Sequence, residues 1–241
     1  MEIKKAVAVV TGANRGVGRA LVEALLQHGA TRVYATGRRL ANLASVVALD
    51  PERVHALQMD VTKPDEIATA AALAQDVNLL ICNAGVLDFG SLLDAPVDAL
   101  RRNMDTNYYG MLHTTRAFAP AIESNGGGAV VNILTLVALA SMPGLGVYNA
   151  SKAAAWSMTQ SLRADLSKRK IQVHAVFPGA VDTDMIRALE MPKTSAADVA
   201  RAVLEGVEAG TEDIFPDPMS KQLYSAWKAD HKAVERQFAS M

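Results

Sequence analysis

The sequence predicts an α/β fold, with one doubly wound parallel sheet of about seven strands and helices on both faces. Short apolar runs rich in β-branched residues alternate with longer helical patterns along the chain. The runs are nearly continuous in apolar residues, which is typical of parallel strands covered on both faces. Residues suited to chemistry follow the ends of these runs, where open α/β sheets bind their ligands.

The elements follow one another in a regular order. The expected strands are Ala6–Thr11, Arg32–Thr36, Val54–Met59, Leu79–Cys82, Val130–Thr135, Gln172–Phe177 and a short one near Ile214. The expected helices lie near Gly18–Gln27, Pro64–Ala74, Pro96–Ser124, Tyr148–Lys168, Ser195–Glu208 and Pro218–Phe238. Three glycines at 126–128 indicate a turn between the third helix and the next strand.

The chain of 241 residues is 50% hydrophobic and shows no linker, repeat or low-complexity segment. This predicts a single domain over residues 1–241 with one large core. Residues 218–241 are expected to form a C-terminal helical extension, because Trp227, Val234 and Phe238 recur at roughly helical spacing. Packing of this extension on the core is favoured over packing on a neighbouring subunit or over a ligand pocket.

Composition argues against several classes of function. The net charge is −1 with no basic block, so neither nucleic acid nor a membrane surface is an expected partner. No apolar run approaches the ~20 residues of a membrane span, and the N-terminus lacks the features of a signal peptide. The lone cysteine, Cys82, fits a reducing compartment, so a cytoplasmic protein is expected. The five histidines show no metal-ligand spacing, which predicts no metal site.

A glycine-rich loop, Thr11–Gly18, joins the first strand to the first helix with the spacing Gly-x-x-x-Gly-x-Gly. Glycines allow a tight turn and the close approach of a pyrophosphate, and the helix N-terminus offers free N–H groups. The expected cofactor contacts in this loop are Gly12, Asn14, Arg15, Gly16, Val17 and Gly18. The alternative is an ordinary glycine turn without a ligand.

The end of the second strand predicts the choice of dinucleotide. An acidic residue there binds the ribose 2′-hydroxyl of NAD, whereas an arginine accommodates the 2′-phosphate of NADP. The sequence here is Thr36-Gly37-Arg38-Arg39, without a carboxylate. A guanidinium binds phosphate through two charge-assisted hydrogen bonds, so Gly37 and Arg38 are expected to favour NADP(H), with Arg15 as a second cation. The alternative is that these arginines only solvate a loop.

Two further strand ends give weaker evidence of cofactor binding. Asp60-Val61 follows the third strand, where a short acceptor can hold an adenine amino group, although Asp in this position is usually a cap or turn residue. Asn83-Ala84-Gly85 follows the fourth strand and would let the backbone approach the cofactor, unless it is an ordinary turn.

Tyr148 and Lys152 are four residues apart, which places a phenol and an ammonium on one face of a helix. A free phenol has a pKa near ~10, and a fixed cation beside it lowers that pKa. A hydroxyl residue, Thr135, precedes Tyr148 at the end of a strand. Such a pair is common by chance, but together with the dinucleotide signals it predicts acid–base chemistry.

These motifs together resemble the short-chain dehydrogenase/reductase family, in the form whose chains are about as long as this one. The resemblance runs from about Ala6 to Ile214, and its matching elements are the Thr11–Gly18 loop, Asp60, Asn83-Ala84-Gly85, Asn107, Thr135, Tyr148-x-x-x-Lys152 and Pro178-Gly179. It implies a Rossmann-like fold, a nicotinamide cofactor, and a homodimer or homotetramer built on the helices Pro96–Ser124 and Tyr148–Lys168.

The resemblance also implies residue roles. Tyr148 would donate a proton to the carbonyl oxygen during reduction, or accept one during alcohol oxidation. Lys152 would bind the nicotinamide ribose and lower the pKa of Tyr148, and Asn107 would hold a water that connects Lys152 to solvent. Val181 would offer its backbone to the carboxamide, and Thr183 would bind near the phosphates. The implied catalytic residues are Tyr148, Lys152, Thr135 and Asn107, and the cofactor residues extend to Pro178, Gly179, Val181 and Thr183.

Two departures from the family pattern lie on the substrate side. Thr135 stands where a substrate-orienting serine is usual, so the hydroxyl is kept but a methyl group stiffens the rotamer and takes up space. Only Asp184–Thr194 separates the cofactor-binding turn from the next helix, which predicts a short lid and a site that is open to solvent or accepts bulky ketones. The expected pocket residues are Met142, Leu145, Met185, Ile186 and Met191.

The predicted function is an NADP(H)-dependent oxidoreductase that interconverts a ketone or aldehyde and its alcohol, both small molecules. The alternative is an NADP(H)-binding sensor without turnover, which loss of Tyr148, Lys152 or Asn107 would have favoured. An epimerase or dehydratase of the longer, sugar-nucleotide branch is disfavoured, because too little chain follows Gly179 for an extra substrate domain.

Overall fold

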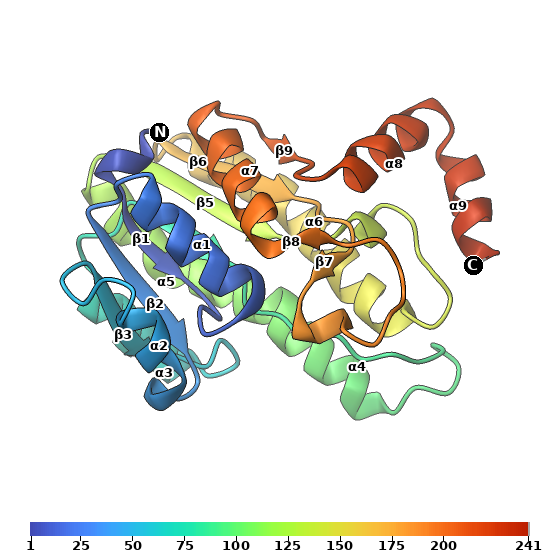
Figure 1. Ribbon diagram of the computed structural model, residues 1–241, viewed down its shortest axis with the longest axis horizontal. Coiled ribbons are helices and arrows are strands. Elements are labelled where there is room, and N and C mark those ends of the chain that lie inside the picture. Colours follow the sequence, from blue (N-terminus) through green and yellow to red (C-terminus); the bar gives the residue numbers. More distant parts are fainter. Residues whose placement is uncertain (241) are drawn as a thin grey trace.

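The computed structural model describes residues 1–240 and shows one sheet between two layers of helices (Figure 1). The seven strands lie in the order β3-β2-β1-β4-β5-β6-β9 and pair in parallel. They are β1 Val7–Val10, β2 Arg32–Gly37, β3 Val54–Gln58, β4 Leu79–Cys82, β5 Gly128–Ile133, β6 Ile171–Val176 and β9 Asp213–Ile214. The predicted Rossmann-like, doubly wound sheet is confirmed, with its strand order reversing between β1 and β4.

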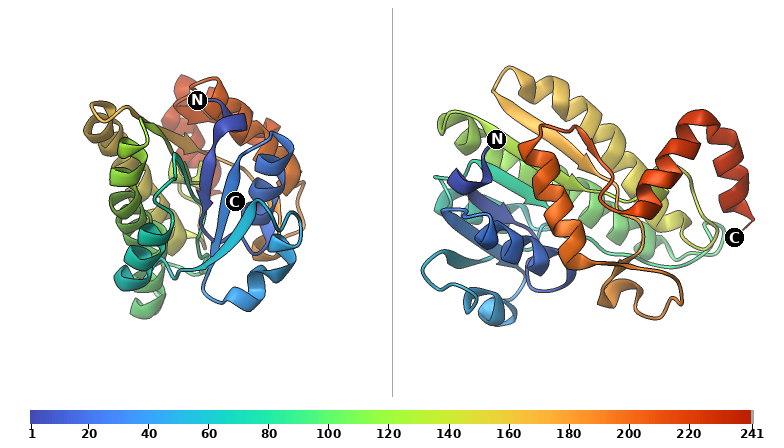
Figure 2. Two further views of the ribbon diagram at one scale, coloured as in Figure 1. Left: turned by 90° about the vertical axis from the view of Figure 1, so that its left-hand side faces the viewer. Right: turned by 45° about the horizontal axis from the view of Figure 1, so that its top comes forward.

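Helices cover both faces of the sheet, as the edge-on view in Figure 2 shows. One face carries α1 (Gly16–Gln27), α2 (Ala44–Val47) and α7 (Ala196–Glu208). The other carries α3 (Pro64–Leu73), α5 (Gly110–Ser124) and α6 (Gly146–Ser167). Side chains alternate along each strand, so that Val10 packs in the first core and Val9 in the second. This alternation between two apolar layers explains the nearly continuous apolar runs of the sequence.

The helix predicted over 96–124 is one helical stretch that contains a wider turn. It consists of α4 (Val97–Met104), a π-helical turn labelled η3 (Asp105–Tyr109), and α5. Asn107 lies in this turn and is fully buried. Such π turns are rare, and they often occur at functional sites.

The single helix predicted over 218–238 is wrong in one respect. The structure has two helices, α8 (Pro218–Ala229) and α9 (His231–Ala239), which are separated by Asp230 in an extended conformation. The carboxylate of Asp230 accepts a hydrogen bond from the Ala233 N–H at 2.9 Å. Asp is a favoured N-cap residue, so it ends one helix by starting the next.

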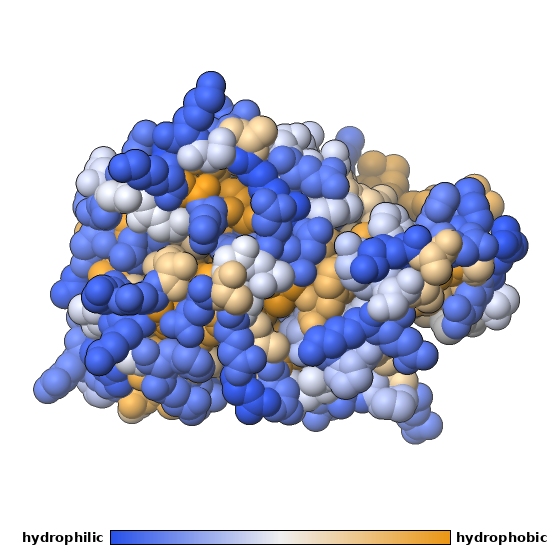
Figure 3. Space-filling view, turned by 90° about the horizontal axis from the view of Figure 1, so that it is seen from above, coloured by the Kyte–Doolittle hydropathy of each residue, from blue (hydrophilic) through white to orange (hydrophobic). Residues whose placement is uncertain are grey.

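The predicted packing of this extension on the core does not hold for α9. Val234 and Phe238 of α9 belong to a third apolar cluster, separate from the two cores of the sheet, and Tyr148 is a member of it. Figure 1 shows α8 and α9 extending beyond the end of the sheet on the side of α6. In the space-filling view of Figure 3 they form a lobe, with apolar surface between the lobe and the body.

Among residues 1–240, no helix combines the length and apolar character that crossing a bilayer requires. Within the same range, no three His, Cys, Asp or Glu side chains are grouped so as to hold a metal ion.

Candidate active site

Loops from five strands meet at the carboxyl end of the sheet. The Ala13 N–H, in the glycine loop after β1, donates to the Thr36 carbonyl near the end of β2 at 3.0 Å. Beyond β5, the Leu136 N–H donates to the Pro178 carbonyl after β6, also at 3.0 Å. The turn after β4 contacts the glycine loop directly. The predicted convergence of strand-end residues is therefore present in the structure.

The glycine loop packs backbone against backbone, which explains its composition. A Cβ on Gly18 would lie 2.2 Å from the carbonyl oxygen of Gly12. Gly12 itself has a φ of +64°, and a Cβ there would lie 3.0 Å from the Cα of Ala84. Arg15 is the N-cap of α1 and gives its first turn no side-chain hydrogen bond. The cradle and the uncapped helix N-terminus fit a dinucleotide pyrophosphate.

Asn83 holds the shape of this loop through its side chain. Its amide donates to the carbonyls of Thr11 at 2.9 Å and Gly12 at 3.2 Å. The Thr11 hydroxyl accepts hydrogen bonds from the N–H groups of Asn83 and Ala84, each at 2.9 Å. From the sequence, only the backbone of this turn is expected to approach the cofactor, and Thr11 has no expected role. The position of Thr11 directly before Gly12 is the signal that could have indicated one.

The two arginines expected at the cofactor differ in their surroundings. Within the described residues, no carboxylate lies within ion-pair distance of Arg38, whose side chain is exposed after the buried Gly37. Arg15 is also exposed, but its guanidinium lies 3.5 Å from the Asp184 carboxylate. Arg38 therefore fits a 2′-phosphate better than Arg15 does, and the role of Arg15 as a second cation stays a prediction.

The remaining cofactor residues lie around the same loop. Asp60 accepts two hydrogen bonds from Thr62 through one carboxylate oxygen, at 2.9 and 2.8 Å. It therefore acts as a turn residue, and its role as an adenine acceptor stays a prediction. Thr183 lies against the glycine loop, because a Cβ on Gly16 would meet its methyl group at 3.2 Å. Asn14 is half-buried in the loop, while Val61 after β3 and Val181 in β7 (Val181–Asp182) are buried.

Tyr148 and Thr135 form a buried pair at the end of β5. Tyr148 lies in the first turn of α6 and is 8% exposed, and Thr135 is 9% exposed. The Thr135 hydroxyl is close enough to the Tyr148 phenol to lower its pKa. The Thr135 hydroxyl also accepts from the Val137 N–H at 3.4 Å, which caps the short 3-10 helix η4 (Leu136–Ala138). The structure thus brings together the two hydroxyls that sequence reasoning paired.

Lys152 lies one turn further along α6 and is also buried. Its ammonium donates to the Ile133 carbonyl at 2.8 Å and lies 5.9 Å from the centroid of the Tyr148 ring. Burial lowers the pKa of Lys152 to about 8.

The pKa of Tyr148 is raised in this arrangement, and the lowering by Lys152 that the resemblance implies stays a prediction. Burial raises the pKa of the Tyr148 phenol, and the Thr135 hydroxyl only partly opposes this rise. Desolvation penalises the charged form of each buried group, so it acts on the phenolate and the ammonium alike. The phenol is therefore held in its protonated form.

Asn107 connects the turn after β4 to α6. Its side chain exchanges two hydrogen bonds with the backbone of Val86, both at 2.9 Å, and donates to the Ser151 hydroxyl at 2.9 Å. A Cβ on Gly85 would lie 3.2 Å from Asn107 Oδ1 and 3.7 Å from Lys152 Nζ. Gly85 thus leaves room for the Asn107 side chain, which a Cβ would crowd. Sequence reasoning missed Ser151, although it directly precedes Lys152.

The substrate side differs from the expectation of an open site. Met185 and Met191, in the expected lid, are 46% and 42% exposed, whereas Met142 packs at the edge of the Tyr148 cluster. Leu145 and Ile186 are half-buried. The segment 184–194 is short as predicted, with the one-turn helix η5 (Asp184–Ile186) leading to β8 (Thr194–Ser195). Tyr148 nevertheless lies in a buried apolar cluster that includes Val234 and Phe238 of α9.

Known proteins match almost the whole chain. A family model described as short chain dehydrogenase matches residues 6–193. An uncharacterized oxidoreductase of Staphylococcus aureus (strain MRSA252) is 32% identical over 208 residues, which cover 82% of this chain and 89% of that protein.

Two solved structures share the fold in detail. A short chain dehydrogenase from Burkholderia cenocepacia J2315, in complex with NADP, is 39% identical with a TM-score of 0.93 and covers 99% of both chains. A short chain dehydrogenase/reductase from Burkholderia phymatum, in complex with NAD, is 26% identical with a TM-score of 0.88, over 98% of this chain and 96% of that one.

Proposed function

The chain belongs to the short-chain dehydrogenase family, and we propose that it is an NADP(H)-dependent oxidoreductase that interconverts a ketone or aldehyde and its alcohol. The observation that carries this proposal is the buried pair of Tyr148 and Thr135, which lies beside Lys152 at the end of β5. The glycine loop and the turn after β4 lie at the same end of the sheet. A proton donor and a dinucleotide cradle are thus placed together.

The features at the end of β2 support NADP(H) over NAD(H). Arg38 is an exposed cation at that strand end, and residues 36–39 include no acidic side chain. The relative solved with NADP is also more similar to this chain than the relative solved with NAD. The Gly12–Gly18 loop would hold the pyrophosphate, Arg38 the 2′-phosphate, and Asp60 the adenine amino group. The bound nicotinamide supplies the hydride chemistry.

The side chains of this site perform the proton chemistry. During reduction, Tyr148 donates its phenolic proton to the carbonyl oxygen of the substrate, and during oxidation its phenolate accepts that proton from the alcohol. Thr135 donates a hydrogen bond that orients the same oxygen. The phenolate left after reduction is stabilised by the Lys152 ammonium, which is the predominant form of Lys152 below its pKa of about 8.

Asn107 positions other parts of the site. Its bonds to Val86 and Ser151 fix the turn after β4 against the segment that carries Lys152. The predicted relay, in which Asn107 holds a water that links Lys152 to solvent, is retained as part of this proposal.

The expected homodimer or homotetramer is also a proposal. Large apolar side chains are exposed along α4, its neighbouring loop and η3, and they provide a surface for a second copy of the chain: Phe89, Leu92, Leu93, Val97 and Tyr109.

A direct assay separates an enzyme from a binding protein. The purified protein is mixed with NADPH and a panel of ketones and aldehydes, and the decrease in NADPH absorbance is followed. We expect consumption of NADPH that depends on the carbonyl compound. Tight NADPH binding without consumption across the whole panel would instead support a sensor without turnover.

Substitutions of Thr135 test its part in the reaction. Thr135→Ser keeps the hydroxyl and is expected to retain activity, whereas Thr135→Val keeps the shape but loses the hydrogen-bond donor. Removal of one such donor lowers kcat by about 10²- to 10³-fold. We therefore expect a loss of this size in kcat/KM for Thr135→Val. Equal activity of the two variants would remove Thr135 from the mechanism.

A further inference from the structure

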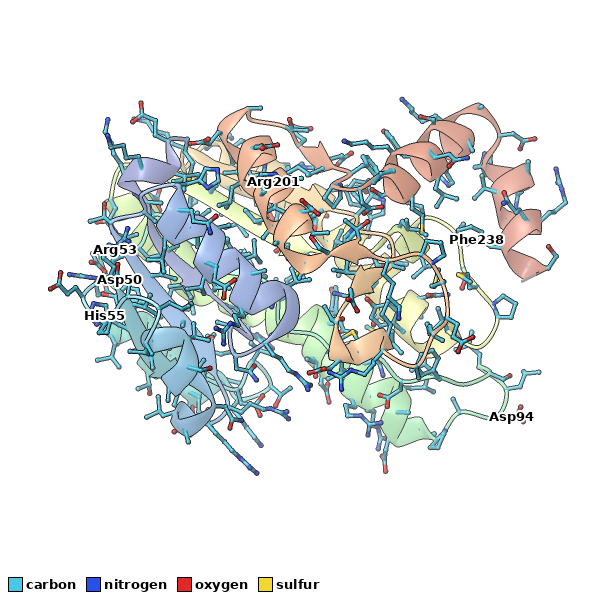
Figure 4. All side chains as sticks on the ribbon, viewed as in Figure 1. Asp50, Arg53, His55, Asp94, Arg201 and Phe238 are labelled. Carbon is cyan, nitrogen blue, oxygen red and sulfur yellow. The ribbon has the colours of Figure 1, made fainter. Side chains whose placement is uncertain are left out.

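The extension at the C-terminus lies against the proposed proton donor. Tyr148 belongs to a buried cluster with Leu136, Val137, Ala140, Val234 and Phe238. Val234 is 2% exposed and Phe238 is 5% exposed. Figure 4 labels Phe238 near the end of α9, on the side of the molecule where the α8–α9 pair lies beyond the sheet. The buried cluster that holds Tyr148 thus includes residues from a helix far away in the sequence.

Helix α8 is firmly attached to the body at its N-terminus. The carboxylate of its N-cap, Asp217, is buried and accepts hydrogen bonds from the N–H groups of Gly179 and Ser220, each at 2.8 Å. Aromatic stacking continues this attachment, since the ring of Phe215 lies 5.0 Å from that of Phe177 in the core and 3.9 Å from that of Tyr224 on α8. The base of the extension is therefore fixed to the turn that follows β6.

Helix α9 is attached in a different way. One extended residue, Asp230, joins it to α8, and of its nine residues only Val234 and Phe238 are buried. Both of these side chains pack in the Tyr148 cluster. The contact of α9 with the body therefore depends on the same apolar surface that a substrate must reach.

We propose that α9 is the lid of the substrate site, and that Val234 and Phe238 form its wall opposite Tyr148 and select carbonyl compounds that carry an aliphatic or aromatic group. This inference rests on the proposed oxidoreductase function. Tyr148 and Thr135 are each less than one-tenth exposed, and in this proposal α9 moves aside to admit a carbonyl group. A bound substrate then takes the place of part of the apolar packing and contacts the same two side chains.

The apolar wall favours uncharged substrates. Apolar or aromatic side chains also pack around the cluster: Leu87, Met142, Met219, Leu223 and Trp227. A nearby charge, the Lys152 ammonium, lies 5.9 Å from the centroid of the Tyr148 ring and already donates to the Ile133 carbonyl. Burial of an unpaired charge is costly, so an α-keto acid or a phosphorylated sugar is disfavoured relative to an aryl or alkyl ketone.

The test compares Phe238→Ala and Val234→Ala with the wild type and with Gln237→Ala. Gln237 is an exposed residue of the same helix, next to Phe238, and its variant is the matched control. Two probes are used with NADPH: acetophenone as the apolar ketone and pyruvate as the small charged one. We expect Phe238→Ala to lower kcat/KM for acetophenone by about tenfold or more through KM, which is the size of effect that lost apolar contacts in a pocket produce. The rate with pyruvate stays low or rises, and Gln237→Ala resembles the wild type.

A second readout does not depend on turnover. Hydrogen exchange of the amides of residues 231–240 is measured with NADPH alone, and again with NADPH and acetophenone in the Tyr148→Phe background. Acetophenone is expected to slow exchange in α9, and Phe238→Ala is expected to remove this protection. Phe238→Leu keeps an apolar side chain and is expected to restore part of this protection. It also controls for misfolding of the alanine variant.

The outcomes separate this inference from the proposed function. Equal losses in Phe238→Ala and Gln237→Ala, or no protection of α9 by acetophenone, would overturn the lid while leaving the reductase intact. If the wild type reduces none of the carbonyls, the proposed function fails, and protection of α9 that depends on Phe238 would still support the apolar site. Preference of the wild type for pyruvate would overturn the selectivity.

Discussion

Tyr148→Phe is expected to lower kcat for carbonyl reduction by about 10³-fold or more, within the range that a positioned general acid contributes. The change removes only the phenolic oxygen, and the ring still fills its place in the cluster that includes Val137 and Phe238. The NADPH Kd should stay within about twofold of the wild-type value, because the glycine loop and Arg38 are unchanged. Turnover is measured by NADPH absorbance and the Kd by titration of NADPH fluorescence.

Tyr34→Phe provides a matched control. This tyrosine lies in β2 and donates to the Asp76 carboxylate at 2.9 Å, away from the carboxyl end of the sheet. Its variant loses a phenolic oxygen in the same way and should keep full turnover. Turnover retained in Tyr148→Phe, with Thr135→Val also active, would contradict the assignment of the proton donor.

The fold was largely predictable because it depends on local patterns. Apolar runs such as Leu79–Cys82 indicated strands, and strand–helix alternation indicated a parallel sheet. The π turn at Asn107 was not predictable in this way, because its buried side chain is held by Val86 and Ser151, which the fold brings to it. The break at Asp230 did have a local signal, since Asp is a strong N-cap residue, but apolar spacing that continues across it suggested one helix.

The candidate site was predictable in position but not in electrostatics. Parallel strands place their carboxyl ends together, so residues such as Gly12 and Thr135 were expected to meet. The pKa of Tyr148 is raised by burial, and nothing near Tyr148 in the sequence indicates that its cluster includes Val234 and Phe238. The hydrogen bond from Gly179 to Asp217 also joins residues 38 positions apart. Contacts of this range follow only from the packed structure.

The second large effect is expected at the end of β2. Gly37→Asp combined with Arg38→Ala should lower the preference for NADPH over NADH by about 10²- to 10³-fold. Loss of hydrogen bonds to a charged group accounts for about 1.5–3 kcal/mol of this change. The new carboxylate adds repulsion of the 2′-phosphate and accepts a hydrogen bond from the 2′-hydroxyl of NADH. The Kd values of both cofactors are measured for each variant.

The structure leaves room for this substitution and supplies its control. A Cβ at position 37 would lie 3.4 Å from a methyl group of Leu43, which is ordinary contact. Arg39→Ala removes an exposed neighbouring arginine and should leave the ratio of the two Kd values nearly unchanged. An unchanged ratio in the double variant would exclude Arg38 as the phosphate contact. Arg15 would then be the remaining candidate cation at the glycine loop, and binding of a 2′-phosphate there would have to displace its ion pair with Asp184.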